Sequence, residues 1–417
     1  MTITAEPTPT QGPPPRSLAD QKPSSLLGYL YQRETREIIF QVVLVATIVA
    51  LFYMIISNAA ANLRARNIAS GLGFLKNVAG FDISQSWIDY SNVSTYGRAF
   101  MVGLWNTVVL AIIGIFFTTI LGFTIGIARL SSNWLIAKIA TVYVEIVRNC
   151  PLLLQMFLWY FAVLKQLPEP LSRVDGVVKS TSYALPGGAL LNTRGLFTPK
   201  PEWLPGSGYI LLALGVAIVA AYLMARWAKA RQVATGQPFP TFLAGLALII
   251  GLPLVTYFVM GRPVQFEYPE LGRFNLSGGM VLLPEFVAVL LGLVFYTASY
   301  IAEIVRAGIV GVSKGQKEAA MAMGLSKGQT LRLVVVPQAM RIIIPPLTSN
   351  YLNLTKNSSL GGAVGYPDMT QVAGTINNQT GQAIETILML MGVYLTISLL
   401  TSAFMNWFNK RMALVER

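Results

Sequence analysis

Long apolar runs, separated by shorter polar segments, dominate the chain. A helix needs about 20 consecutive apolar residues to cross a bilayer, and eight runs approach or exceed that length. Their length, more than any internal periodicity, predicts membrane-spanning helices. The eight runs lie near Ile38–Ser57, Phe100–Ala128, Trp134–Leu164, Tyr209–Ala225, Pro240–Met260, Val281–Glu303, Met340–Leu354 and Ile384–Trp407.

The seventh run differs from the others because it contains adjacent prolines, Pro345 and Pro346, and ends in polar residues. Proline removes a backbone donor and clashes with the preceding turn of a helix. Irregular backbone at membrane depth is tolerated where it lines a cavity enclosed by protein. We therefore expect this span to be short and broken.

Three polar segments lie outside the runs. Residues 1–26 contain "PTPTQGPPP" and few apolar residues, which predicts a disordered tail rather than a signal peptide. Residues 58–98 contain "LRARNIASGLGFLKNVAGFDIS", whose alternating basic and apolar residues are typical of a segment along the outer membrane interface. Residues 165–208 are rich in Pro, Gly and Ser, and we expect them to form a loop.

Composition supports a membrane protein, because 54% of the 417 residues are hydrophobic and only 12% are charged. The net charge of +13 does not indicate nucleic-acid binding here, since Lys and Arg collect in the cytoplasmic loops of membrane proteins. Eight spans place both termini on one side, and the loops of that side hold more Lys and Arg, including the basic turn "ARWAKARQ" at 225–232. We therefore expect both termini, and the polar loop between the sixth and seventh runs, in the cytoplasm.

The residue inventory excludes several kinds of chemistry. The single cysteine, Cys150, rules out an internal disulfide, and beside Pro151 it favours packing or a kink over a redox role. No histidine is present, which removes the usual catalytic base and most zinc sites. No G-x-x-x-x-G-K-[ST] motif is present, so we expect the chain to bind no ATP, Mg²⁺, metal or other cofactor itself.

The tetrapeptide Ser-Lys-Gly-Gln occurs twice, around one glycine, in "SKGQKEAAMAMGLSKGQTLRL" (313–333). Ser313 with Gln316 forms one possible capping box, and Ser326 with Gln329 forms a second. Gly324 is suited to end the first helix, since the left-handed conformation costs glycine nothing. The pattern predicts helix–turn–helix, with a break or bend before Pro337.

Three interpretations of this loop remain open. A short helix with small and Met side chains suits docking into the groove of a partner. A DNA-binding helix-turn-helix has similar spacing, but there is no third helix here to build its core. An ordinary cytoplasmic loop with helix-start signals is the third possibility.

The loop resembles the EAA loop of ABC importer permeases. The family spacing, E-A-A-x3-G-x9-I-x-L-P, matches Glu318, Ala319, Ala320 and Gly324, with Val334 and Val336 in place of Ile and Leu. "SYIAEIVRAGI" (299–309), "IVRNCPLLLQMF" (146–157) and "KNSSL" (356–360) are similar to segments of the polar amino-acid branch. Asn149-Cys150 and Ser358 depart from that branch, which weakens inference about the substrate.

The resemblance implies an all-α polytopic membrane protein with a type I ABC importer permease core of five helices. The core would comprise 95–165 and 281–412, the latter with the coupling helix in 313–333. The extra N-terminal helix in 27–94 and the two-helix insertion in 166–280 resemble the general L-amino-acid permease group.

The same resemblance implies a role and partners. The chain would be the permease subunit of an importer that carries L-amino acids, polar, acidic or of broad range, from periplasm to cytoplasm across a bacterial inner membrane. Expected partners are a paralogous permease in a heterodimer, two ATP-binding subunits that hold ATP and Mg²⁺, and a periplasmic amino-acid-binding protein. In that family the EAA loop contacts the ATPase, which assigns coupling here to Ser313, Glu318, Ala319, Ala320, Gly324 and Ser326.

Polar residues within the spans are candidates for substrate contact. An ionised side chain inside a span costs roughly 2.5–3.5 kcal/mol, so such groups usually face a cavity or one another. An amino acid needs a cation for its carboxylate and an anion for its ammonium group. The candidates are Lys356, Asn357, Glu303, Tyr300, Arg148 and Glu145. Glu145–Arg148 and Glu303–Arg306 also fit self-contained i,i+3 ion pairs, whereas no acidic residue lies within four positions of Lys356.

Two other functional classes remain as alternatives. An ion-coupled secondary amino-acid transporter would be expected to show inverted repeats with matching broken helices, and only one broken span is predicted here. A membrane enzyme lacks support, because the sequence has no histidine, no G-x-S-x-G motif and no carboxylate cluster.

Overall fold

The computed structural model describes residues 33–65, 71–174, 177–272 and 276–412. The chain divides into two units, Met1–Ser70 and Gly71–Arg417. Seven helices in the described ranges are long and apolar enough to cross a membrane, or eight if one bent pair counts as a single span. The expected mostly helical membrane fold with about eight spans is therefore confirmed. The predicted tail, 1–26, lies outside the described residues.

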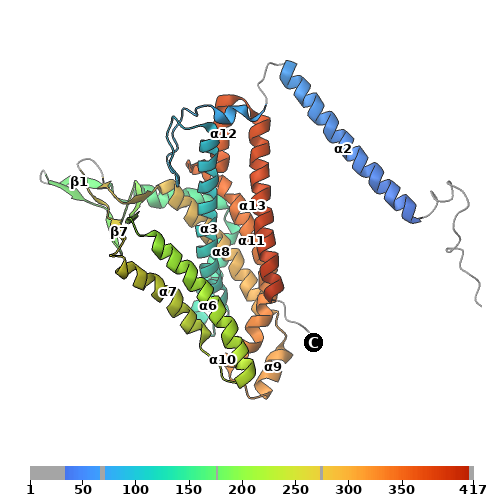
Figure 1. Ribbon diagram of the computed structural model, residues 1–417, viewed down its shortest axis with the longest axis vertical. Coiled ribbons are helices and arrows are strands. Elements are labelled where there is room, and N and C mark those ends of the chain that lie inside the picture. Colours follow the sequence, from blue (N-terminus) through green and yellow to red (C-terminus); the bar gives the residue numbers. More distant parts are fainter. Residues whose placement is uncertain (1–32, 66–70, 175–176, 273–275, 413–417) are drawn as a thin grey trace, which may run out of the picture. The chain divides into compact units, whose positions relative to one another are not determined.

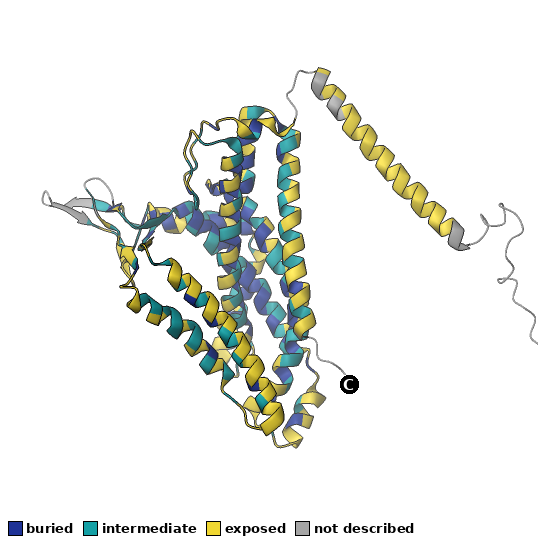
Figure 2. Cartoon of the chain, viewed as in Figure 1, coloured by how far each residue is buried: buried dark blue, intermediate teal, exposed yellow. Residues whose placement is uncertain are grey.

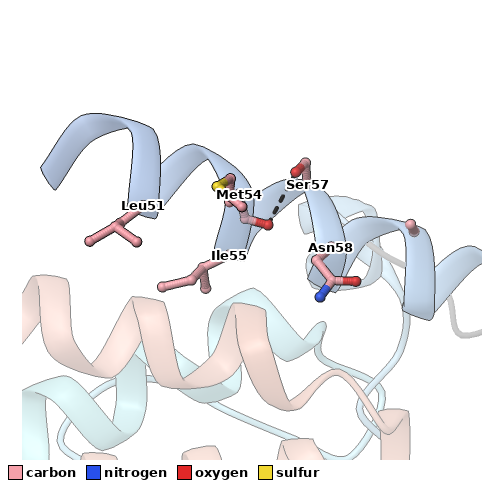
Figure 3. A pocket seen from close by; sticks show the side chains of 6 residues that line it. Leu51, Met54, Ile55, Ser57 and Asn58 are labelled. Carbon is pink, nitrogen blue, oxygen red and sulfur yellow. Dashed lines mark hydrogen bonds between the residues drawn. The ribbon is translucent and has the colours of Figure 1, made fainter. Parts of the chain in front are cut away.

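The first unit contains one described helix, α2 (Arg33–Ala65), which includes the predicted run near Ile38–Ser57. All of its described side chains are exposed, as expected of an apolar helix with lipid around it. Figure 3 shows Leu51, Met54 and Ile55 along this helix, with Ser57 donating a hydrogen bond to the Met54 carbonyl at 3.1 Å. That bond satisfies the hydroxyl within the helix itself.

The second unit is built on a bundle of long helices (Figure 1). Helices α3, α8 and α11 pack on one another, and α12 and α13 pack on this group. Figure 2 shows the buried residues gathered on these central helices. The bounds are α3 Tyr96–Ala128, α8 Pro284–Val310, α11 Val336–Asn357, α12 Met369–Thr380 and α13 Ala383–Met412.

Glycines on α3 allow close contact with α8. A Cβ added at Gly122 would lie 2.6 Å from the Cβ of Ile301, and one at Gly126 would lie 2.8 Å from the Ala302 carbonyl oxygen. Small residues at such positions let two membrane helices approach closely enough for dispersion contacts to hold them together. Because of this packing, the C-terminal ends of α3 and α8 lie side by side.

The third predicted run is bent by 107°, between α4 (Trp134–Asn149) and the helical segment 152–166. That segment comprises α5 (Leu152–Phe157), a π-turn (Leu158–Val163) and a 3-10 turn (Leu164–Gln166). The residue before a proline avoids helical geometry, and Cys150 has φ −95° and ψ 125°. Gln155 Nε2 donates to the carbonyls of Val147 and Cys150, both at 2.9 Å, so the freed acceptors at the bend are satisfied. The predicted kink at Cys150-Pro151 is confirmed.

The expectation that the seventh run is short and broken is wrong. Helix α11 continues through Pro345 and Pro346 and ends at Asn357. Membrane helices tolerate interior prolines where neighbouring elements satisfy the freed backbone groups. The broken run is therefore the third, at a proline that follows a helix end, and not the seventh, where two prolines lie inside a packed helix.

An inserted helical hairpin joins the two halves of the bundle. It consists of α6 (Gly208–Thr235) and α7 (Thr241–Val259), which pack on each other. Gly236, with φ +71°, ends α6 in the left-handed conformation that favours glycine. The two predicted runs in this region are confirmed as helices.

The expectation of a loop over 165–208 is wrong, because six short strands lie there. They are β1 Leu171–Val174, β2 Val177–Ser180, β3 Tyr183–Leu185, β4 Ala189–Asn192, β5 Gly195–Thr198 and β6 Lys200–Trp203. After α7 come β7 Val264–Glu267, β8 Glu270–Leu271, β9 Leu276–Ser277 and β10 Met280–Leu282.

Antiparallel pairing of these strands joins the two ends of the insertion. Strand β6 pairs with β7, and the four-stranded sheet has the order β10-β5-β4-β3, with Phe197 opposite Val281. The chain thus enters and leaves the α6–α7 hairpin through paired strands. Apolar alternation in β5, where Gly195 and Phe197 are buried, was hidden by the turn residues around it.

Residues 71–95 pack on the bundle. A 3-10 turn, Leu72–Lys76, places Phe74 against α3 and α12, and Ala79 is buried in the same cluster. Asn106 on α3 is fully buried and donates to the carbonyls of Gln85 and Pro367, both at 2.8 Å. These bonds fix the segment to α3 and to the loop before α12.

Candidate coupling loop and polar cavities

The first helix of the 313–333 loop is α9 (Lys314–Ala322), as predicted. The predicted capping box at its start is wrong, because the Ser313 side chain makes no capping bond. The Gln316 side chain instead accepts a hydrogen bond at 3.3 Å from Gln338 on α11. Gln316 is thus drawn towards a neighbouring helix and not back to the start of its own.

Gly324 ends α9 as the sequence predicts. It has φ +81°, in the region that costs a side-chain-bearing residue energy. The Leu325 amide donates to the Ala320 carbonyl at 3.2 Å, and the Gly324 amide donates to the Met321 carbonyl at 2.9 Å. This pair of bonds is a Schellman motif, which satisfies the last carbonyls of a helix.

The second capping box is present. The Gln329 amide donates to Ser326 Oγ at 3.4 Å, and the Ser326 amide donates to Gln329 Oε1 at 2.9 Å. The short helix α10 (Lys327–Thr330) then passes through a π-turn, Leu331–Val335, into α11. The predicted bend before Pro337 is this π-turn, and π-turns frequently occur at functional sites.

The loop combines an anchored side with an exposed side. Ala320 is 5% exposed, and Val312 and Val335, at the two ends of the loop, belong to a buried cluster with residues of α8 and α11. Glu318 and Ala319 are exposed, and Met323 is 85% exposed. Helix α9 is therefore held against the bundle on one side, and the Glu318 and Met323 side chains are exposed on the other.

A polar cavity of about 550 Å³ lies near the C-terminal ends of α3, α4 and α8. It collects four of the six predicted substrate residues, Glu145, Arg148, Tyr300 and Glu303, together with three that complete its polar wall: Arg129, Asn149 and Arg306. Three guanidinium groups and two carboxylates therefore share one space, although they come from three helices.

The ion pairs in this cavity show which of the two i,i+3 pairs, Glu145–Arg148 and Glu303–Arg306, is self-contained. Glu303 bonds Arg306 on its own helix, with Arg306 Nη2 2.6 Å from Glu303 Oε1, and it also bonds Arg129 at the end of α3. Within the described ranges, no ion pair joins Glu145 to Arg148. Arg148 instead lies 4.9 Å from the centre of the Tyr300 ring, a cation–π contact. The self-contained pair is therefore present for Glu303 and Arg306 but not for Glu145 and Arg148.

A second cavity, of about 210 Å³, lies beside the first and shares Tyr300 with it. Its lining carries no ionisable acid or base other than phenols: Tyr296, Thr297, Tyr300, Asn350, Asn353 and Asn357. Of these, the sequence analysis identified only Tyr300 and Asn357. The signal that was missed is the spacing of three asparagines, at i, i+3 and i+7, on one helical face of "SNYLNLTKN" (349–357).

Lys356 lies in the last turn of α11, where it is exposed and lines neither cavity. Arg129, which lies at the C-terminal end of α3, was also missed. Its contact with Glu303 joins residues far apart in the sequence, so no local sequence pattern predicts it.

A buried carboxyl group lies outside the spans, at the start of α12. Asp368 is fully buried, and its Oδ1 accepts a bond from the Gln371 amide at 2.9 Å as the helix N-cap. Burial raises the pKa of this carboxyl group to about 6. In the part of the chain that the structure describes, no group of three or more His, Cys, Asp or Glu is placed to hold a metal ion.

Comparison with known proteins relates this arrangement to a family. The profile described as "Binding-protein-dependent transport system inner membrane component" matches residues 217–414. The chain is 54% identical over 393 residues to the "General L-amino acid transport system permease protein AapQ" of Rhizobium johnstonii, covering 94% of this chain and 96% of that one.

Two further relatives have similar coverage. The chain is 50% identical over 382 residues to the "Putative amino-acid ABC transporter permease protein YhdX" of Escherichia coli, covering 91% of this chain and 94% of that one. It is 39% identical over 411 residues to the "Glutamate/glutamine/aspartate/asparagine transport system permease protein BztB" of Rhodobacter capsulatus, covering 93% and 96%.

Proposed function

This chain belongs to the family of binding-protein-dependent transport system inner membrane components, and on that premise we propose that it carries L-amino acids inward across the membrane as the permease subunit of an ABC importer. The amino-acid class is supported by the names of relatives that match over nearly the whole chain. Family membership leaves no support for the ion-coupled alternative.

We propose that partner ATPase subunits supply the energy through the 313–333 loop. The observation that carries this proposal is the anchoring of α9: a Schellman motif ends it, a capping box follows at Ser326, and Gln316 bonds α11. A rigid connection is needed because switching a two-state pore from 1:99 to 99:1 takes about 5.5 kcal/mol of differential binding. A loop without these bonds would move by itself and would not transmit the differential binding free energy to the membrane helices.

The transport cycle then follows alternating access. Closure of two ATP-binding subunits, which hold ATP and Mg²⁺, moves a coupling helix on each of two permeases and opens the polar cavities to alternate sides. One chain supplies one such helix, so the second comes from a partner permease, proposed to be a paralogue. A periplasmic amino-acid-binding protein delivers the substrate. The chain lies in a bacterial inner membrane, with both of its termini on the cytoplasmic side.

Within the charged cavity, Arg148 suits the substrate's carboxylate and Glu145 its ammonium group, because neither is engaged in an ion pair with the other. Glu303 and Arg306 are structural residues of the cavity wall, since Glu303 bonds both Arg306 and Arg129. Lys356, next to Asn357, is a second candidate for the carboxylate. Replacing Lys356 by Met tests it, and unchanged uptake affinity and rate would remove it from the site.

The coupling role is tested in proteoliposomes that contain the whole complex. Glu318→Lys combined with Gly324→Val reverses the exposed charge and forces a β-branched residue into φ +81°. We expect uptake, and the stimulation of ATP hydrolysis by the binding protein, to fall at least about tenfold, because docking of α9 on the ATPase is lost.

The matched control is Gly315→Ala in the same helix. Gly315 lacks a positive φ, and an added Cβ meets nothing within 4 Å, so this variant should behave as the wild type. Wild-type uptake by the double variant would refute the coupling role.

A further inference from the structure

Helix α11 presents three asparagines to one small cavity. Asn350, Asn353 and Asn357 lie at i, i+3 and i+7, which places them on one face of the helix. They face Tyr296, Thr297 and Tyr300 of α8 across a space of about 210 Å³. The wall of this cavity is therefore polar on both sides and carries no fixed charge.

Two of the three amides are not used by the protein. Asn350 Nδ2 donates to the Pro346 carbonyl at 3.0 Å, as an asparagine inside a helix often does. In the described ranges, no hydrogen bond engages the side-chain amides of Asn353 or Asn357. The Tyr296 and Tyr300 hydroxyl groups bond each other at 3.0 Å.

A free amide inside a membrane span is costly unless water or a ligand satisfies it. Each amide here offers an N–H₂ donor and a C=O acceptor. Together they match the carboxylate and the ammonium group of a zwitterion without favouring either sign of charge on the rest of the molecule.

The cavity lies near the middle of α8 and along the C-terminal third of α11. Tyr296 is about 18 Å along α8 from Pro284, and Asn353 is about 25 Å along α11 from Val336, at 1.5 Å per residue. Substrate sites of alternating-access transporters lie at this depth. Tyr300 also lines the charged cavity, so the neutral cavity adjoins the one that contains Glu145 and Arg148.

We propose that the Asn350–Asn353–Asn357 face, with the Tyr296–Tyr300 pair, is a neutral subsite that binds the amino acid during passage and accepts acidic and uncharged side chains alike. This inference rests on the proposed amino-acid transport function. Amides contribute hydrogen bonds of similar strength to either kind of side chain, whereas a fixed carboxylate at the same place would repel an acidic one. Asn353, at the centre of the face, is assigned as the residue that lets the site accept both acidic and uncharged side chains.

The test measures uptake of radiolabelled L-glutamate and L-glutamine, which differ in charge but have nearly the same shape. Proteoliposomes contain the whole importer with saturating binding protein, ATP and Mg²⁺. In Asn353→Asp we expect the ratio of glutamate to glutamine uptake to fall about tenfold, since the new carboxylate repels the carboxylate of the glutamate side chain. In Asn353→Leu we expect both rates to fall together, with the ratio unchanged.

Asn378→Asp is the matched control, because Asn378 is exposed on α12 and lines neither cavity. Its uptake ratio should equal that of the wild type. An unchanged ratio in Asn353→Asp, in a complex that still hydrolyses ATP, would overturn the subsite. A wild type that takes up only one of the two amino acids would also contradict it, whereas a wild type that takes up neither would reject the transport function itself.

Discussion

Gln338 Nε2 on α11 donates a hydrogen bond to Gln316 Oε1 on α9, at 3.3 Å. This bond joins the exposed loop helix to a membrane helix whose C-terminal half carries the three asparagines of the neutral cavity. A displacement of α9 therefore has a direct polar connection to the helix that lines the proposed pathway. The bond between Gln338 and Gln316 also explains why Gln316 makes no capping bond with Ser313.

We expect Gln316→Leu and Gln338→Leu each to lower the amount of amino acid taken up per ATP hydrolysed by about threefold to tenfold. A net hydrogen bond contributes about 0.5–1.5 kcal/mol, which sets that range. The double variant should be no worse than either single variant, because both changes remove the same interaction. Additive losses in uptake per ATP would show that the two glutamines act independently.

The two serines of the repeated Ser-Lys-Gly-Gln should differ in their effects. Ser326→Ala removes a capping bond and should lower the local stability of α10 by about 1 kcal/mol. Ser313→Ala should have almost no effect, because the Ser313 side chain caps nothing. Hydrogen exchange of amides in 313–333, measured on the purified complex, distinguishes the two. Equal loss of protection in both variants would contradict this assignment.

Glu303→Gln should weaken the contact between the C-terminal ends of α3 and α8. It removes the carboxylate shared by Arg129 and Arg306 and leaves two guanidinium groups facing each other. Hydrogen bonds to charged groups contribute about 1.5–3 kcal/mol, so we expect a lower thermal midpoint in detergent. Adding Arg129→Met should restore part of it by removing one unpaired cation, whereas a further drop would show that Arg129 has another partner.

Asp368 predicts a pH dependence of stability. Burial raises the pKa of its carboxyl group from 3.8 to about 6 in the folded protein, so the folded state holds the proton more tightly than the unfolded one. The free energy of unfolding should therefore fall as pH rises from about 4 to about 6, by about 3 kcal/mol, and then level off. Thermal unfolding between pH 4.5 and 7 measures this decline.

Asp368→Asn should remove most of that decline while keeping the helix cap, because an asparagine oxygen also accepts the bond from the Gln371 amide. An equally steep decline in this variant would assign the dependence to another group.

Features governed by neighbouring residues were predicted correctly. The bilayer thickness fixes how long an apolar helix must be, so the runs alone located the spans. The turn at Gly324 followed because only glycine takes φ +81° without strain. The capping box formed at Ser326 but not at Ser313, although the Ser-x-x-Gln spacing is the same, because Gln316 bonds Gln338 instead.

Features that depend on distant contacts were not predicted. Proline alone did not show which span bends: Pro151 starts a new helix at a bend, while Pro345 and Pro346 lie within a packed one. The strands of 165–208 were missed because turn residues masked them, and pairing such as β6 with β7 spans an inserted hairpin.

The sequence by itself thus determined that this chain spans a membrane, has no ATP-binding motif of its own, and carries a helix–turn–helix loop with the EAA pattern. Only the tertiary structure decided that Gln316 bonds Gln338, that Glu303 takes Arg129 as a second partner, and that Asn353 faces Tyr296 across a cavity. The physical reason is the range of the interactions. Apolar run length, glycine conformation and helix caps act within a few residues, whereas a cavity wall exists only once α8 and α11 pack against each other.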